Sequence, residues 1–194
     1  SDKDPTVILL HYPSILEDTI NYIPPRVKIE VSCLSMDEPT ELRPIRSLIG
    51  ETFDGEDTDA ESLVRTVVPT RTFLEKLFLL AEEFQKEKPR SVRMSRHLYD
   101  LEKLMDTEYG KEALSNRKLY DAIVEHRKTY YALKYVNYDL HSPLTINFTI
   151  PESAMDAWQD DYADMRRFFI YGESLKFDAL MQKIRELQDR VRIM

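Results

Sequence analysis

The chain has 194 residues, enough for one domain with a sizeable core or for two small domains that share an interface. Its 42% hydrophobic and 32% charged residues are typical of a globular, helix-rich protein, and its 4 glycines are too scattered for a phosphate-binding glycine-rich loop. The net charge of −8 excludes a surface that attracts nucleic acid everywhere, so any RNA contact must be local.

The cysteine content and the hydropathy of the chain indicate the cellular compartment in which we expect the protein. Cys33 is the only cysteine, which excludes an internal disulfide framework and a cysteine-rich zinc site. The chain contains no apolar run of membrane-spanning length, and its first residues lack the pattern of a signal peptide. We therefore expect a cytoplasmic protein that makes no contact with membranes.

The first third of the chain is predicted to consist of strands with short connections. Apolar residues at 6–10 and 63–69 predict two strands, the second stopped by Pro69. Strict alternation of apolar and polar residues over 26–33 predicts a third strand, buried on one face. A short helix is expected at 41–50.

From residue 70 onward the pattern is helical. Thr72 and Glu75 have the spacing of a capping box, which predicts that a helix begins at Thr72. Gly172 is the expected end of a later helix, and Ser174 the expected cap of the last one. Further helices are expected at about 94–106, within 111–136 and from about 153, with an extended segment at 142–151.

The last helix carries an apolar seam with spacings of three and four residues. Such a seam is predicted to pack against another helix, in this chain or in another. Strands followed by helices indicate an α+β fold. The seam consists of Phe177, Leu180, Ile184, Leu187 and Val191.

Four charged side chains are candidates for chemistry, each with an ordinary structural alternative. Lys76 lies at the margin of an apolar helix face, where it either extends to solvent or brings a cation into a partly closed cleft. Arg96 and Asp100, four residues apart, form either a site or a surface ion pair of a few tenths of a kcal/mol. Glu30, on the polar face of its strand, offers one carboxylate for Mg²⁺, too few for a catalytic metal pair.

Two loops are strongly charged. Residues 86–96 contain five cations and one acid, which predicts either a solvated loop or a local RNA contact. The acidic loop 51–61 contains Asp57 and Asp59 with D-x-D spacing, but no apolar strand fixes their geometry, and a solvated loop is expected. The histidines have no metal-binding spacing.

Two stretches, RTFLEKLFLL at 71–80 and RMSRHLYDLEKL at 93–104, resemble the paired motifs of the AbiEii/AbiGii nucleotidyltransferase toxins of bacterial abortive-infection and toxin–antitoxin systems. The tail at 157–180 is similar to the D-Y-x-x-M, Y-G and F-x-x-L pattern of that family, and RVKIEV at 26–31 resembles the strand that carries the last carboxylate of the nucleotidyltransferase core. The matching residues of the two central motifs are Arg71, Thr72, Phe73, Glu75 and Lys76, then Ser95, Arg96, His97, Tyr99, Asp100 and Leu101.

This resemblance implies a fold and an activity. Residues 1–69 would be the remainder of a nucleotidyltransferase sheet, and residues 70–194 a mostly helical bundle domain. The protein would transfer a nucleotide from a nucleoside triphosphate to an acceptor, with tRNA as the expected acceptor, in phage defence. The resemblance implies Lys76, Asp100 and Glu30 as catalytic residues, Glu30 as a Mg²⁺ ligand, Lys76 and Arg96 as nucleotide-binding residues, and Arg71, Arg90 and Arg93 as RNA-binding residues.

The chain departs from the family pattern at its beginning. Nothing before Glu30 contains the Gly-Ser turn and D-x-D strand that bind the metal ions, so we expect a truncated chain that is inactive alone and binds Mg²⁺ only with the missing motif. A cognate antitoxin is a further expected partner. The alternative is a helical interaction module, an antitoxin, immunity or adaptor protein, that binds through its last helix. In that case Lys76 and Arg96 would point separately into solvent.

Overall fold

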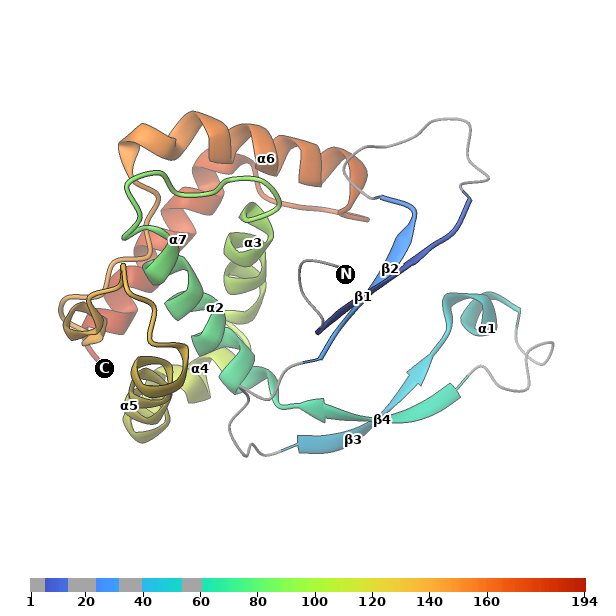
Figure 1. The fold of residues 1–194 in the computed structure, drawn as a ribbon, viewed down its shortest axis with the longest axis horizontal. Coiled ribbons are helices and arrows are strands. Elements are labelled where there is room, and N and C mark those ends of the chain that lie inside the picture. The colour runs from blue at the N-terminus through green and yellow to red at the C-terminus, as the bar shows by residue number, and fades with distance from the viewer. Residues whose placement is uncertain (1–5, 14–23, 32–39, 54–60) are drawn as a thin grey trace.

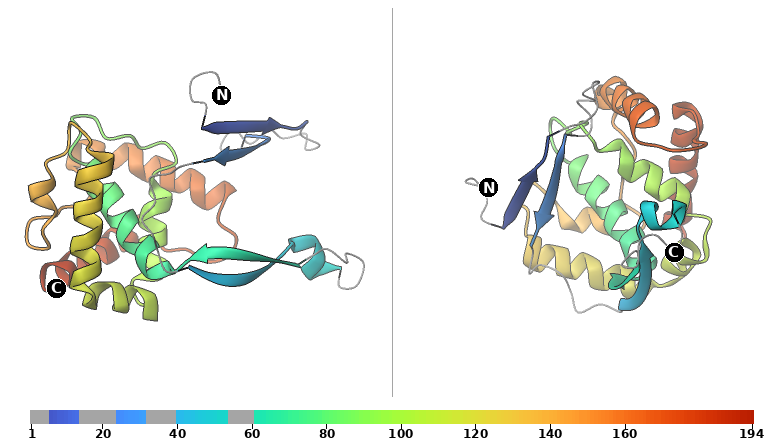
Figure 2. Two further views of the ribbon diagram at one scale, coloured as in Figure 1. Left: turned by 60° about the horizontal axis from the view of Figure 1, so that its bottom comes forward. Right: turned by 90° about the vertical axis from the view of Figure 1, so that its right-hand side faces the viewer.

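The computed structural model describes residues 6–13, 24–31, 40–53 and 61–194 and confirms an α+β fold. Within these residues the strands form two separate antiparallel pairs (Figure 1). Both pairs project from the same side of the helical body, as a second view also shows (Figure 2). The first pair is β1 (Val7–His11) with β2 (Arg26–Glu30), and the second is β3 (Thr40–Arg46) with β4 (Glu61–Val67).

The strand region differs from the sequence prediction in two respects. The helix expected at 41–50 is wrong, because residues 40–46 pair with β4 and only α1 (Leu48–Thr52) is helical. The Ser47 hydroxyl caps α1 and accepts a hydrogen bond from the Gly50 N–H at 2.9 Å. β2 is not buried on one face, since Val27 and Ile29 are 52% and 41% exposed. Cys33, Asp57 and Asp59 lie outside the described residues.

The helical body is built around α2, which contacts α3, α4 and α5, while α3 also contacts α6 and α7. Six apolar side chains of α2 are buried, so this helix forms the centre of the core. No helix of the described segments is long and apolar enough to cross a membrane. The helices are α2 (Pro69–Glu83), α3 (Ser95–Leu104), α4 (Glu108–Ser115), α5 (Arg117–His126), α6 (Met155–Phe168) and α7 (Phe177–Arg192), with a π-helical turn η1 (Arg127–Tyr131) and 3₁₀ turns η2 (Tyr138–His141) and η3 (Glu152–Ala154).

Helix α2 begins three residues before the predicted start. Pro69 is its first residue and Val68 its N-cap, and Thr72 lies inside the helix. Proline suits the first helical position, because its φ is already helical and its missing N–H would have no partner there. The capping box predicted from Thr72 and Glu75 is therefore wrong.

Helix α7 packs inside this chain. All five residues of its apolar seam are buried, and the helix contacts α3 and α6. Its N-cap is Lys176, whereas the hydroxyl of Ser174 accepts from Arg166 Nε at 3.0 Å. Helix α6 ends at Phe168, so Gly172, with φ +96°, lies in the following loop rather than at the helix end. The segment 142–151 is irregular, and every second residue from Ile146 to Ile150 is buried.

Candidate functional site

Lys76 on α2 and Asp100 on α3 form an ion pair between the two helices. The Lys76 Nζ lies 2.6 Å from Asp100 Oδ2, and the two side chains are 22% and 35% exposed. Lys76 therefore extends toward the neighbouring helix and not into bulk solvent. The sequence left this choice open.

Arg96 joins this pair in one concavity, the central pocket, with a volume of about 550 Å³. The central pocket is lined by Lys76, Arg96, His97, Tyr99, Asp100 and residues of and after α6. Three of the four candidates from the sequence thus meet in one place, as a site requires.

Glu30 lies in an adjoining concavity, the basic pocket, of about 430 Å³. Arg96 lines both pockets. The Glu30 carboxylate is 2.6 Å from Lys28 Nζ. Among the described residues, the basic pocket gathers five cations around this one carboxylate, namely Arg26, Lys28, Arg90, Arg93 and Arg96.

The start of α3 is fixed by Asp161, which lies on α6. The buried Asp161 carboxylate accepts hydrogen bonds from the backbone N–H of Arg93 at 2.6 Å, from the N–H of Ser95 at 3.0 Å and from the Ser95 hydroxyl at 2.5 Å. Arg93 has φ +58°, an uncommon left-handed conformation for a non-glycine residue, and the hydrogen bond from its N–H to Asp161 stabilises it. Asp161 thereby sets the position from which α3 presents Arg96 and Asp100.

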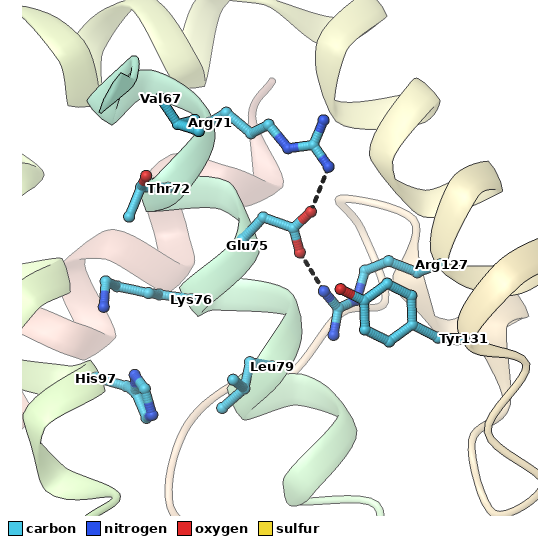
Figure 3. Close-up of a pocket in the computed structure, with 9 residues that line it drawn as sticks. All are labelled: Val67, Arg71, Thr72, Glu75, Lys76, Leu79, His97, Arg127 and Tyr131. Carbon is cyan, nitrogen blue, oxygen red and sulfur yellow. Dashed lines mark hydrogen bonds and ion pairs between the residues drawn. The ribbon is translucent and has the colours of Figure 1, made fainter. Parts of the chain in front are cut away.

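On the other side of Lys76, α2 forms the floor of a third concavity, the Tyr131 pocket, of about 380 Å³ (Figure 3). Glu75 binds Arg71 Nη2 at 2.7 Å through one oxygen and Arg127 through the other. Arg127 also binds Glu82, with Nε 2.7 Å from Oε1, and its guanidinium lies 4.5 Å from the centre of the Tyr131 ring.

Sequence reasoning missed this network. Arg127 lies 52 residues from Glu75. Nothing in the local pattern around an arginine in EHRKTYY indicates burial. Arg71, predicted to bind RNA, has a side chain that is only 7% exposed and paired with Glu75.

His97 separates the central and Tyr131 pockets and lines both. Its side chain is buried, and within the described part of the chain Nδ1 has no hydrogen-bond partner. Burial, and then the charges of Lys76, Arg96 and Arg90, lower the pKa of His97 to about 3. The imidazole is therefore neutral at physiological pH, although it lies beside cations.

The described residues do not by themselves form a magnesium site. Among them no three His, Cys, Asp or Glu side chains gather in a way that would hold a metal ion. In the described segments, Glu30 is the only carboxylate that lines the basic pocket, and it is already paired with Lys28. A catalytic Mg²⁺ pair needs several oxygen ligands, so Glu30 alone does not fit.

The three pockets follow one another along α2 and α3, because they share Lys76, Arg96 and His97, and we call this row of pockets the groove. Its basic and central pockets suit a polyanionic ligand. Phosphate groups in proteins are commonly held by arginine and lysine side chains, so the basic and central pockets have the chemistry of a phosphate-binding site. A sequence model described as the nucleotidyl transferase AbiEii toxin of type IV toxin–antitoxin systems matches residues 1–183. The chain therefore belongs to the AbiEii nucleotidyltransferase toxin family.

Membership of this family implies a nucleotidyltransferase activity, a nucleoside triphosphate substrate and an antitoxin partner. Neither a search of curated proteins nor a search of solved structures gives a match to the chain.

Proposed function

We propose that the protein transfers a nucleotide from a nucleoside triphosphate to the 3′ end of tRNA. An acceptor oxygen bonds to the α-phosphorus, the bond to the β-phosphate breaks, and pyrophosphate leaves. The observation that carries the proposal is the convergence of Lys76, Arg96 and Asp100 on one pocket beside the basic pocket.

Each of the three residues has a distinct role in this proposal. Lys76 and Arg96 hold the triphosphate and stabilise the negative charge that moves onto the leaving pyrophosphate. Asp100 holds the Lys76 ammonium in position, as the 2.6 Å contact supports. Glu30 contributes a metal ligand only together with carboxylates from outside the described residues.

The RNA contact in this proposal lies at the basic pocket. Arg90 and Arg93 line it and are positioned for a phosphate backbone. The guanidinium of Arg71 is nearly buried and paired with Glu75, so Arg71 contributes by forming part of the groove wall. The proposal includes a cognate antitoxin as partner and a role in phage defence in the bacterial cytoplasm.

Two observations argue against the alternative of a helical interaction module. It requires an exposed seam on α7, but these side chains are buried inside the chain. It also requires Lys76 and Arg96 to point separately into solvent. Arg96 is exposed, but both residues line the central pocket, which favours the nucleotidyltransferase proposal.

The test is replacement of the pair in the full-length protein. We expect Lys76→Ala and Asp100→Ala each to reduce nucleotide transfer at least 100-fold, the usual scale for losing a group that stabilises transition-state charge, and to abolish toxicity. The melting temperature should change little, because a partly exposed ion pair contributes about 1 kcal/mol or less.

Lys118→Ala is the matched control, since this exposed lysine of α5 lies outside the three pockets. Loss of folding in the two variants, or full activity without the pair, would refute the proposed roles.

A further inference from the structure

The charge of the groove changes from one end to the other. At the basic pocket, five cations face one carboxylate, counted over the described part of the chain. At the Tyr131 pocket, the guanidinium groups of Arg71 and Arg127 are neutralised by Glu75 and Glu82, and the remaining wall includes Val67, Leu79 and the Tyr131 ring. The groove therefore has a polycationic end and an end that is close to neutral and partly apolar.

The central pocket joins these two ends. It shares Arg96 with the basic pocket and shares Lys76 and His97 with the Tyr131 pocket. A ligand held at Lys76 and Arg96 can therefore extend in two directions, toward strong positive charge or toward the aromatic ring.

A nucleoside triphosphate has the same asymmetry, with a polyanionic chain at one end and a neutral planar base at the other. We propose that the Tyr131 pocket binds the nucleobase of the substrate triphosphate, with the base stacked on the Tyr131 ring and the phosphates directed past Lys76 to Arg96. This inference rests on the proposed function and adds the orientation of the substrate and the residues that contact its base.

The local structure holds the Tyr131 ring in place. Tyr131 ends the π-helical turn η1, and Ala132 closes that turn with φ +43°. Arg127 packs on the ring and is itself fixed by Glu75 and Glu82, so the ring is positioned before a ligand arrives.

The same pocket offers uncharged hydrogen-bonding groups. The Thr72 hydroxyl lines it and has no hydrogen-bond partner among the described residues. His97 lines it as a neutral imidazole whose buried Nδ1 has no hydrogen-bond partner among the described residues. Neutral donors and acceptors suit the edge of a base or a ribose hydroxyl better than they suit phosphate.

The experiment compares two kinds of ligand. Binding of the four nucleoside triphosphates and of inorganic tripolyphosphate, which lacks a base, is measured for the wild type, Tyr131→Ala and Tyr131→Phe. We expect Tyr131→Ala to weaken binding of at least one nucleoside triphosphate about tenfold, the scale of base–aromatic stacking, and to leave tripolyphosphate binding unchanged. Tyr131→Phe should bind like the wild type.

Tyr130→Ala is the matched control, because this neighbouring tyrosine of η1 is 64% exposed and does not line the pocket. If Tyr131→Ala is misfolded by circular dichroism, Tyr131→Leu gives the same comparison, since it keeps apolar bulk and removes the aromatic face.

The outcomes separate the inference from the proposed function. Unchanged nucleoside triphosphate binding in Tyr131→Ala, equal weakening of tripolyphosphate, or weakening only of a short single-stranded RNA would overturn the inference. Arg96→Gln tests the proposed function separately, because it should weaken both ligands. If Arg96→Gln weakens neither, the triphosphate site fails, whatever the Tyr131 variants show.

Discussion

Asp161→Ala removes the carboxylate that holds the start of α3. In the structure this buried group accepts three hydrogen bonds, two from backbone N–H groups and one from the Ser95 hydroxyl. The substitution leaves these donors without a partner and removes a negative charge from a helix N-terminus. The position of Arg96, one residue further along, depends on the same contacts.

The expected cost follows from these contacts. A hydrogen bond to a charged group contributes about 1.5–3 kcal/mol, and loss of an N-cap typically costs about 1 kcal/mol. These contributions overlap, so we expect a total loss of about 3–5 kcal/mol in the free energy of unfolding, similar to the loss of one partner from a buried charged pair. Asp161→Asn keeps one acceptor oxygen and should lose roughly half as much.

The measurement is urea unfolding followed by circular dichroism. For a chain of this size, each kcal/mol shifts the melting temperature by about 2–4 °C, so thermal unfolding should show a decrease of at least about 6 °C. Asp160→Ala is the control, because Asp160 is exposed on the same helix and its loss should cost less than about 0.5 kcal/mol. Equal stability of Asp161→Ala and Asp160→Ala would show that the carboxylate does not hold α3.

Two further predictions concern stability. The pKa of His97 is lowered in the folded chain to about 3, so only the unfolded chain takes up its proton as the pH falls below about 6.5, and stability decreases from there toward pH 3 by about 1.4 kcal/mol per pH unit. We expect the free energy of unfolding, measured with urea, to fall between pH 7 and pH 5 by about 2 kcal/mol less in His97→Gln than in the wild type. An equal fall in both proteins would contradict burial of a neutral imidazole. Gly110→Ala should lose about 1–3 kcal/mol in the same assay at pH 7, because its Cβ would lie 2.3 Å from the Leu104 carbonyl oxygen. Lys111→Ala, at the next and exposed position of α4, should be nearly neutral, and a Gly110→Ala variant as stable as this control would exclude the close contact.

The helical part of the fold could be predicted from local patterns. The α7 seam has a regular spacing, and all five of its residues are buried. Spacing alone does not identify the partner surface, which is why the sequence allowed either this chain or another. The predicted start of α2 was wrong for a related reason. Two signals, a proline and a Thr–Glu pair, lie three residues apart, and the proline determines where the helix begins.

The burial of the strands was predicted less well, because a two-stranded pair without a covering layer does not bury either of its faces. Alternation in β2 predicts burial of one face, yet among the described residues no second layer covers Val27 or Ile29. The strand β3 contains a proline and three charged residues, which favoured a helix start over a strand. Its pairing with β4 is a non-local contact that no local pattern of residues 41–46 encodes.

The candidate site was predictable only in part. Lys76, Arg96 and Asp100 were candidates from their helix positions, the motif resemblance gave them roles, and the structure brings them together. Asp161 belonged to the resembling tail, but its contact with the start of α3 spans 66 residues and could not be derived from spacing. No local pattern marks Arg127 or Tyr131 as a site residue. A charged residue in a polar helix, such as Arg127, is ordinarily exposed.

The connection between β4 and α2 has a mechanical consequence. β4 ends at Val67, α2 begins at Pro69, and Val67 also lines the Tyr131 pocket. One residue with extended backbone, Val68, is the whole link, so it provides no slack. Any tilt of the β3–β4 hairpin against α2 must therefore be absorbed within β4, at Val68 or in the first turn of α2, and it displaces the wall of the Tyr131 pocket that Val67 forms.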